Sequence, residues 1–261
     1  MKRIFALLTI IFFSVATYAQ GAADMTIAPT EPSVLWERAN AAYNAGDYAT
    51  ALASYESIAG EGLLSAALYY NMANAYFKQG DTAHAILYYR RALRLAPADE
   101  DIRHNLEYAE QSTKDIIDEI PEFFLFAWLC SVRDVMGCNA WTILSLLMLV
   151  ATIVAAMLYL LSQRLSARKT GFYSMVACGV MFFLTTAFAL SARGVMVNSS
   201  EAVIMSRSVS IKSSPDRSST ELFVLHEGTT VTTGDEVDGW IEVRIADGRK
   251  GWIENSRLEH I

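Results

Sequence analysis

The sequence predicts a multidomain chain built from an all-α repeat solenoid, a hairpin of two membrane-spanning helices and a small all-β barrel. Three observations predict this order. The stretch "AGDYATALASY" at 45–55 is echoed 34 residues later by "QGDTAHAILYY" at 79–89. Two apolar runs, 140–161 and 172–190, each match the ~20 residues that cross a bilayer. The tail, 202–261, alternates β-branched and polar residues between short turns.

The composition is that of a protein with membrane segments. Hydrophobic residues make up 53% of the 261 residues and charged residues only 19%, a balance expected when long apolar runs dilute the charge. The formal net charge of −7 argues against a nucleic-acid partner, because neutralising phosphates requires a basic surface.

Residues 1–19 have the features of an export signal peptide. Two basic residues open the chain, and an apolar stretch follows over 4–15. Thr17 and Ala19 are small enough for the −3 and −1 positions of a cleavage site, so we expect cleavage before Gln20. A retained membrane anchor is the alternative interpretation.

The internal repeat predicts pairs of antiparallel helices. Gly46 and Gly80 are placed to end the first helix of each pair, where a residue without Cβ takes a left-handed conformation. Tyr55 and Tyr89 are expected to fill the gap between neighbouring pairs, and small alanines to let the paired helices approach. A further helix, Asp99 to Lys114, begins with acidic residues that suit a helix N-terminus and is expected to cap the array.

The period and the residue pattern resemble the tetratricopeptide repeat. The second copy carries the family's signature residues Ala73, Tyr76, Gly80, Ala85, Tyr89, Ala92 and Pro97. The first copy carries Ala39, Gly46, Tyr48, Ala51 and Tyr55. It departs from the pattern at Ile58, where the family has alanine, and at Gly60 and Gly62, where it has proline. The resemblance implies a domain of two repeats and a capping helix over residues 32–118.

In tetratricopeptide solenoids the inner helices line a concave groove that binds partner proteins. The 34-residue period gives three columns of groove residues: Trp36, Tyr70 and His104; Glu37, Asn71 and Asn105; Asn40, Asn74 and Tyr108. Amides can pair with the backbone of an extended peptide while rings pack on its side chains. The family often places an asparagine at the position of Asn74 to hold a peptide.

One alternative and one exclusion apply to this groove. Trp36 and Tyr70 could simply cover the helix pair. The basic residues with which some relatives bind a terminal carboxylate are absent from the columns, so we do not expect the groove to recognise a C-terminus.

An interfacial segment, 121–137, precedes the apolar hairpin. It is rich in aromatic residues but interrupted by Arg133 and Asp134, so we expect it to lie at the membrane surface. The loop of the hairpin, "SQRLSARKT", carries three positive charges and no acid, whereas each outer flank carries one arginine. Positive charge stays on the cytoplasmic side. We therefore predict a two-pass membrane protein whose loop is cytoplasmic and whose N-terminal and C-terminal domains lie on the outer side.

The tail resembles the bacterial SH3 family. The runs "VSIKSS", "ELFVLHEGTTVTTGDEVDGWIEVRI" and "RKGWIE" are separated by turns, and "GDEVDGWIEVRI", "ADGRKGW" and "LEHI" follow the family's order of strands. This resemblance implies a small all-β SH3-like barrel over 202–261. Trp240 and Trp252 are candidates for its ligand face, the alternative being that both rings pack on the barrel core. Bacterial relatives are often associated with cell-wall peptides, which implies peptidoglycan as a ligand.

No catalytic residues, cofactor motif or metal site can be recognised. The four histidines are scattered without paired-ligand spacing, and the nucleophile, phosphate-loop and zinc-protease motifs are absent. Cys130, Cys138 and Cys178 have no metal-ligand spacing. We expect them to be buried thiols, with a disulfide between Cys130 and Cys138 as the alternative. The sequence therefore predicts a binding protein and not an enzyme.

The order of all these segments resembles BatE-like proteins of the Bacteroides aerotolerance operon. The resemblance implies a non-enzymatic scaffold in an inner-membrane complex for oxygen tolerance or envelope stress. In a bacterial inner membrane the predicted topology places the N-terminal and C-terminal domains in the periplasm. In that family the neighbouring gene products include von Willebrand A-domain proteins, other tetratricopeptide proteins and a MoxR-type AAA+ ATPase. The first two are the implied partners. The alternative function is a cell-wall sensor or tether whose barrel binds peptidoglycan.

Overall fold

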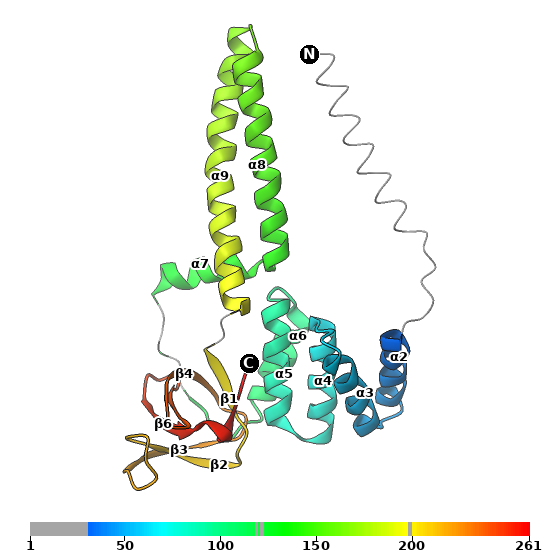
Figure 1. Ribbon diagram of the computed structural model, residues 1–261, viewed down its shortest axis with the longest axis vertical. Coiled ribbons are helices and arrows are strands. Elements are labelled where there is room, and N and C mark those ends of the chain that lie inside the picture. The colour runs from blue at the N-terminus through cyan, green and yellow to red at the C-terminus, as the bar shows by residue number, and fades with distance from the viewer. Residues whose placement is uncertain (1–30, 118–119, 121–122, 198–199) are drawn as a thin grey trace.

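The computed structural model describes residues 31–117, 120, 123–197 and 200–261 (Figure 1). A helical solenoid, a long helical hairpin and a small β domain follow one another along the chain, as predicted. The expected export signal, 1–19, lies outside the described residues.

The solenoid consists of consecutive antiparallel helices that begin and end where their capping residues dictate. These are α2 (Glu31–Asn44), α3 (Tyr48–Gly60), α4 (Ala66–Gln79), α5 (Thr82–Leu95) and α6 (Glu100–Glu110). Side chains at the N-caps of α3, α4, α5 and α6 each accept a bond from a backbone N–H three residues on: Asp47, Ser65, Asp81 and Asp99. Gly46 and Gly80 have φ of 82° and 83°, which confirms their left-handed helix ends.

Small residues allow the paired helices to approach closely. Ala39 and Ala51 of the first repeat, and Ala73 and Ala85 of the second, are fully buried. Tyr55 and Tyr89 are also buried, at 1% and 2% exposure. The cores of the two repeats thus have the same construction, as the 34-residue period predicts.

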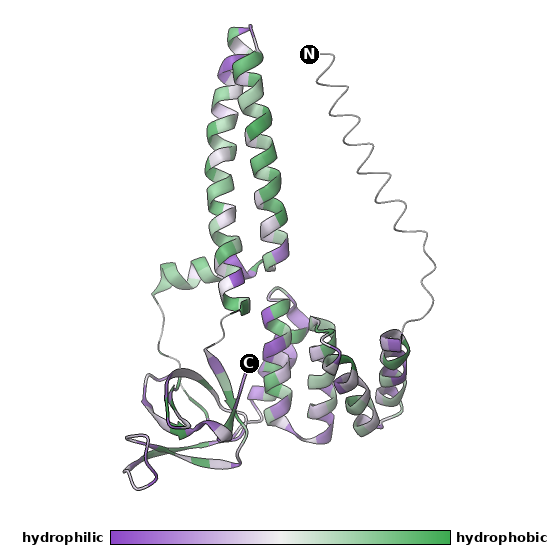
Figure 2. Cartoon of the chain, viewed as in Figure 1, coloured by the Kyte–Doolittle hydropathy of each residue, from purple (hydrophilic) through white to green (hydrophobic). Residues whose placement is uncertain are grey.

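The hairpin pairs α8 (Cys138–Leu161) with α9 (Leu165–Val197). Among the described residues, these two helices are long and apolar enough to cross a membrane, and Figure 2 shows apolar residues along both. The expected second segment, 172–190, lies within α9, which is longer because most of the predicted loop is helical and the turn spans only 162–164. Leucine, alanine, arginine and lysine in that loop favour helix, which explains the longer α9.

Close contacts hold the hairpin together. A Cβ at Gly171 would lie 2.6 Å from the backbone nitrogen of Tyr159, so only glycine permits this approach of α9 to α8. The hydroxyls of Ser145 and Thr186 are hydrogen-bonded across the pair at 2.7 Å. Such small and hydroxylated contacts are typical of helices that pack within a bilayer.

Helix α7 (Phe124–Asp134) crosses the base of the hairpin (Figure 1). The indole nitrogen of Trp141 donates to the carbonyl of Arg133 at 2.8 Å, which holds the end of α7 against α8. Phe124, Phe126 and Trp128 of α7 are exposed. The predicted interfacial segment is therefore a short helix with large apolar side chains on its surface.

The β domain is an antiparallel sheet that closes around its own core. Its strands are β1 (Glu201–Ile204), β2 (Ser208–Lys212), β3 (Glu221–His226), β4 (Thr230–Val237), β5 (Trp240–Arg244), β6 (Lys250–Glu254) and β7 (Leu258–His260). Within residues 200–261 the strand order is β3-β2-β6-β5-β4-β1-β7. Each strand contributes at least one residue to a common apolar cluster, so the sheet must curl around that cluster.

The barrel and the solenoid pack against each other through a shared buried cluster. Val203 and Ile261 of the barrel belong to the same buried cluster as Ile86 of α5. Arg91 of α5 lies 3.0 Å from the carboxylate of Glu259 and also donates to a carbonyl of β7 at 2.6 Å. The sequence did not predict this interface, which ties the two domains together on one side of α5.

A carboxylate after α6 adds a second contact between the domains. Asp115 Oδ1 lies 2.7 Å from His226 Nδ1, while its Oδ2 accepts from the backbone N–H of His226 and the hydroxyl of Thr229, both at 2.7 Å. Lys114 Nζ lies 3.0 Å from the other ring nitrogen of His226. Burial would raise the pKa of Asp115, but the hydrogen bonds from His226 and Thr229 outweigh it and lower that pKa.

We predict that Asp115 makes the domain contact sensitive to acid. A lowered carboxyl pKa stabilises the folded state fully above the unfolded value near 3.8, and that stability is lost as the pH falls through the folded pKa. Asp115→Asn should lower the free energy of unfolding at neutral pH by about 1–3 kcal/mol and flatten its fall below pH 4. Thermal unfolding of the detergent-solubilised full chain at pH 3 to 7 measures both effects.

The control is Asp235→Asn, on an exposed part of β4, which should leave the unfolding curve unchanged. Equal behaviour of the two variants would contradict the assignment to Asp115.

Candidate functional site

A cleft of about 350 Å³ lies on the solenoid between α4 and α6. Aromatic and amide side chains dominate its lining: Tyr43, Tyr70, Asn74, Phe77, Lys78, Tyr89, Asn105 and Tyr108. The predicted groove residues Tyr70, Asn74, Asn105 and Tyr108 are therefore brought together. Trp36, Glu37, Asn40, Asn71 and His104 do not line this cleft.

A hydrogen-bond network fixes the centre of the cleft. Asn74 Oδ1 accepts from the hydroxyl of Tyr89 at 2.5 Å and from Asn105 Nδ2 at 3.2 Å. Asn105 Nδ2 also donates to the hydroxyl of Tyr70 at 2.8 Å. Because two donors occupy the carbonyl of Asn74, its amide N–H groups are what it has left to offer a ligand.

The same network recurs in the first repeat. Asn40 Oδ1 accepts from the hydroxyl of Tyr55 at 2.6 Å and from Asn71 Nδ2 at 3.4 Å. Asn40 and Asn74 are 34 residues apart, and so are Tyr55 and Tyr89. These amides join one repeat to the next, which is a structural role that the columns alone did not reveal.

The remaining predicted groove residues fall into two groups. Trp36 packs edge-on against Tyr55, with ring centroids 5.7 Å apart, and joins the core of the first repeat. It covers the helix pair, as the alternative interpretation held. Glu37 and His104 are exposed and lie outside the cleft lining.

Several cleft residues were missed by the sequence analysis. Tyr43 and Phe77 are 34 residues apart, so the same period contained a fourth column that could have found them. Phe77 meets the ring of Tyr108 at 5.6 Å in an edge-on contact. Lys78 gives the cleft a cation that the three columns lack.

Burial keeps the tyrosine at the back of the cleft protonated. It raises the pKa of Tyr89, with smaller contributions from Tyr70 and Tyr43. The hydroxyl therefore remains a donor to Asn74 across the physiological range. Rings, amide donors and one cation make a surface for an extended polypeptide.

The barrel carries a second candidate surface. In the register of β5 and β6, Trp240 faces Glu254 and Trp252 faces Glu242. The buried residues Ile241 and Ile253 alternate with the tryptophans, and neither ring belongs to the barrel core. The interpretation that these rings pack on the core is wrong, because strand alternation sends them to the outer face.

Comparison with known families agrees with this architecture. The tetratricopeptide repeat family matches residues 66–99, and the bacterial SH3 domain family matches residues 207–259. The chain contains both domains. The first repeat lies outside the matched range, in keeping with its departures at Ile58, Gly60 and Gly62. Strand β1 also precedes the matched range, yet it pairs with β4 and β7 and completes the barrel. No curated protein matches the chain.

Within the described part of the chain, no three His, Cys, Asp or Glu residues are grouped to hold a metal ion. Cys130, Cys138 and Cys178 are free thiols of intermediate exposure. The alternative of a disulfide between Cys130 and Cys138 is therefore not realised in this structure.

We predict strong coupling between Asn74 and Tyr89. Asn74→Ala leaves the buried hydroxyl of Tyr89 without its acceptor and should lower the free energy of unfolding by about 1–3 kcal/mol. Adding Tyr89→Phe removes the orphaned hydroxyl, so the double variant should lose less than the sum of the two single losses. Denaturant unfolding of the full chain in detergent measures the cycle.

Asn44→Ala, at the exposed end of α2, is the matched control and should cost little. Strictly additive losses for Asn74 and Tyr89 would show that the network does not hold the cleft.

Proposed function

We propose that the protein is a non-enzymatic scaffold anchored in the bacterial inner membrane, whose tetratricopeptide groove binds an extended segment of a partner protein. The observation that carries this proposal is the aromatic cleft between α4 and α6. The side chains that line it are different from those that bind the barrel, so domain docking leaves the groove open.

The chemistry of the cleft limits what it can bind. The exposed ring of Tyr108 and the neighbouring Phe77 suit apolar or aromatic side chains. The amide of Asn74 can donate to a backbone carbonyl, and Lys78 can pair with an acidic side chain. An extended segment with alternating apolar and acidic residues fits these groups best.

The apolar hairpin supports membrane anchoring. Large side chains along α8 and α9 are exposed, which would be unfavourable in water and is expected in lipid. The positive charges of Arg164, Arg168 and Lys169 gather at its tip. By the positive-inside rule this tip is cytoplasmic, and the solenoid and barrel are periplasmic.

The physiological role is proposed from the resemblance to BatE-like proteins. It would be assembly of an inner-membrane complex for oxygen tolerance or envelope stress, with von Willebrand A-domain and tetratricopeptide proteins of the same operon as partners. Two surfaces on one anchor raise the effective concentration of one ligand near the other, which suits an assembly protein.

A second candidate function is a cell-wall sensor or tether. It is favoured by the bacterial SH3 match and by the outward-facing Trp240 and Trp252. Sedimentation of the detergent-solubilised full chain with peptidoglycan tests it, and Trp240→Ala with Trp252→Ala should abolish any pelleting. Pelleting that survives this double change would remove the barrel face from consideration.

The scaffold proposal predicts loss of partners from a groove variant. Tyr108→Ala with Lys78→Ala should remove specific membrane proteins that co-purify from native membranes in mild detergent, because both side chains line the cleft and are exposed. Neither change touches the Asn74 network. Quantitative mass spectrometry of the purified complexes measures the loss.

Leu64→Ala, an equally exposed change in the connection between α3 and α4, should retain the partners. If the same proteins persist with the groove variant, the groove is not the binding surface.

The proposed topology predicts which residues are accessible from outside. In intact spheroplasts a membrane-impermeant maleimide should label Ser213→Cys of the barrel. It should label Gln163→Cys at the hairpin tip only after the membrane is permeabilised. The parent chain, with its three native cysteines, sets the background. Labelling of Gln163→Cys in intact spheroplasts would reverse the orientation.

A further inference from the structure

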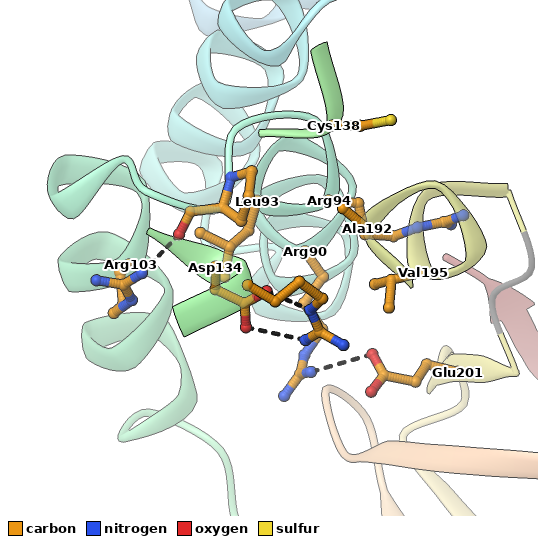
Figure 3. A pocket seen from close by; sticks show the side chains of 11 residues that line it. Arg90, Leu93, Arg94, Arg103, Asp134, Cys138, Ala192, Val195 and Glu201 are labelled. Atoms are coloured by element: carbon orange, nitrogen blue, oxygen red, sulfur yellow. Dashed lines mark hydrogen bonds and ion pairs between the residues drawn. The ribbon is translucent and has the colours of Figure 1, made fainter. Parts of the chain in front are cut away.

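A second cavity, of about 300 Å³, lies where the solenoid, the hairpin and the barrel meet (Figure 3). Four arginines line it together with two carboxylates: Arg90, Arg94, Arg103, Arg133, Asp134 and Glu201. The arginines come from α5, α6 and α7. Positive charge from three separate helices therefore converges on one space.

The carboxylates do not neutralise all of these arginines. Arg133 forms a two-point pair with Asp134 at 2.6 and 2.9 Å. Arg90 lies 2.7 Å from Glu110 and 3.4 Å from Glu201. These contacts account for two of the four guanidinium groups.

The other two guanidinium groups form hydrogen bonds to main-chain oxygens, and the carboxylate of Glu201 also acts on Arg94 through its charge. Arg94 donates to the carbonyl of Met196 and to a main-chain oxygen of Ile261, and Arg103 donates to the carbonyl of Pro97 at 2.6 Å. The buried Nε atoms of Arg90 and Arg94 have no acceptor in the described part of the chain. A buried N–H of a cation that has no acceptor is costly unless an anion joins it.

The position of the cavity indicates the kind of anion. Cys138 begins α8, and Ala192 and Val195 lie near the end of α9, so the base of the apolar hairpin forms one wall. This is the end opposite the positively charged tip. Helix α7 beside it exposes Phe124 and Trp128, as helices at the headgroup level of a bilayer do. An anion held here could extend apolar chains along α8 and α9.

We propose that this cavity binds a phosphate group, and that the phosphate belongs to an anionic phospholipid of the outer leaflet. Guanidinium groups bind phosphate oxygens in pairs and remain charged at all physiological pH values. The lipid source rests on the membrane anchoring proposed above, whereas phosphate recognition by the arginines does not. Bound lipid would join the three parts of the protein at the membrane surface.

Arg103 is the residue to change. Its side chain is exposed, makes a single hydrogen bond within α6 and the preceding turn, and takes no part in docking the barrel. Arg103→Gln should therefore fold normally. The matched control is Arg38→Gln, the same loss of charge on an exposed position of α2 at the far end of the solenoid.

The test uses the purified full-length protein in an uncharged detergent with three separate probes: short-chain phosphatidylglycerol, short-chain phosphatidylcholine and inorganic phosphate. Binding is measured by the shift in thermal unfolding and by lipid retained in native mass spectrometry. We expect saturable binding of phosphatidylglycerol and none of phosphatidylcholine. Arg103→Gln should weaken that binding about tenfold or more, as loss of a charge-assisted hydrogen bond does, and Arg38→Gln should not.

Each other outcome overturns part of the inference. Inorganic phosphate that binds as tightly as phosphatidylglycerol would assign the cavity to a soluble anion and remove the lipid. Absence of binding by both, or equal weakening by Arg38→Gln, would remove the phosphate site itself. A protein that sediments with membranes and retains no lipid defeats this inference alone. A protein found in the soluble fraction defeats the anchoring proposal, and the inorganic phosphate probe still decides the cavity.

Discussion

The arrangement of the domains depends on α5, because apolar residues on both faces of this helix must be buried. Two repeats and a cap are fewer than the three repeats that usually give a solenoid enough buried surface. Here α4 and α6 cover one face of α5, and the barrel covers the other through Val203 and Ile261, which share a buried cluster with Ile86. The barrel thus completes the core of the solenoid, and Arg91 and Asp115 orient the contact around it.

This shared core determines how the protein presents its surfaces. The groove between α4 and α6 and the tryptophan face of the barrel are held in a fixed relation, because both domains pack on the same helix. The hairpin rises from the same junction (Figure 1). An extended chain of independent domains would let each surface move separately, whereas this arrangement limits their relative movement.

The candidate groove was only partly predictable. A period of 34 residues selected Tyr70, Asn74, Asn105 and Tyr108, which the structure places in one cleft lining, because residues at one repeat position occupy equivalent places in the solenoid. It could not separate an amide that faces a ligand from one that bonds a neighbouring repeat. That distinction depends on where the hydroxyls of Tyr55 and Tyr89 reach, 15 residues further along the chain. Trp240 and Trp252 show the same limit, since their facing depends on the register of β5 and β6.

The sequence by itself determined the helices, the turns between them, the apolar hairpin and the strands of the tail. These follow from local rules: glycine at left-handed helix ends, aspartate and serine at N-caps, apolar length, and alternation in strands. Only the tertiary structure decided that the barrel packs on α5 and that four arginines meet at the base of the hairpin. Arg90 and Glu201 are separated by 111 residues, and no local pattern records such a contact, because it arises from the burial of surfaces that each domain could have covered in other ways.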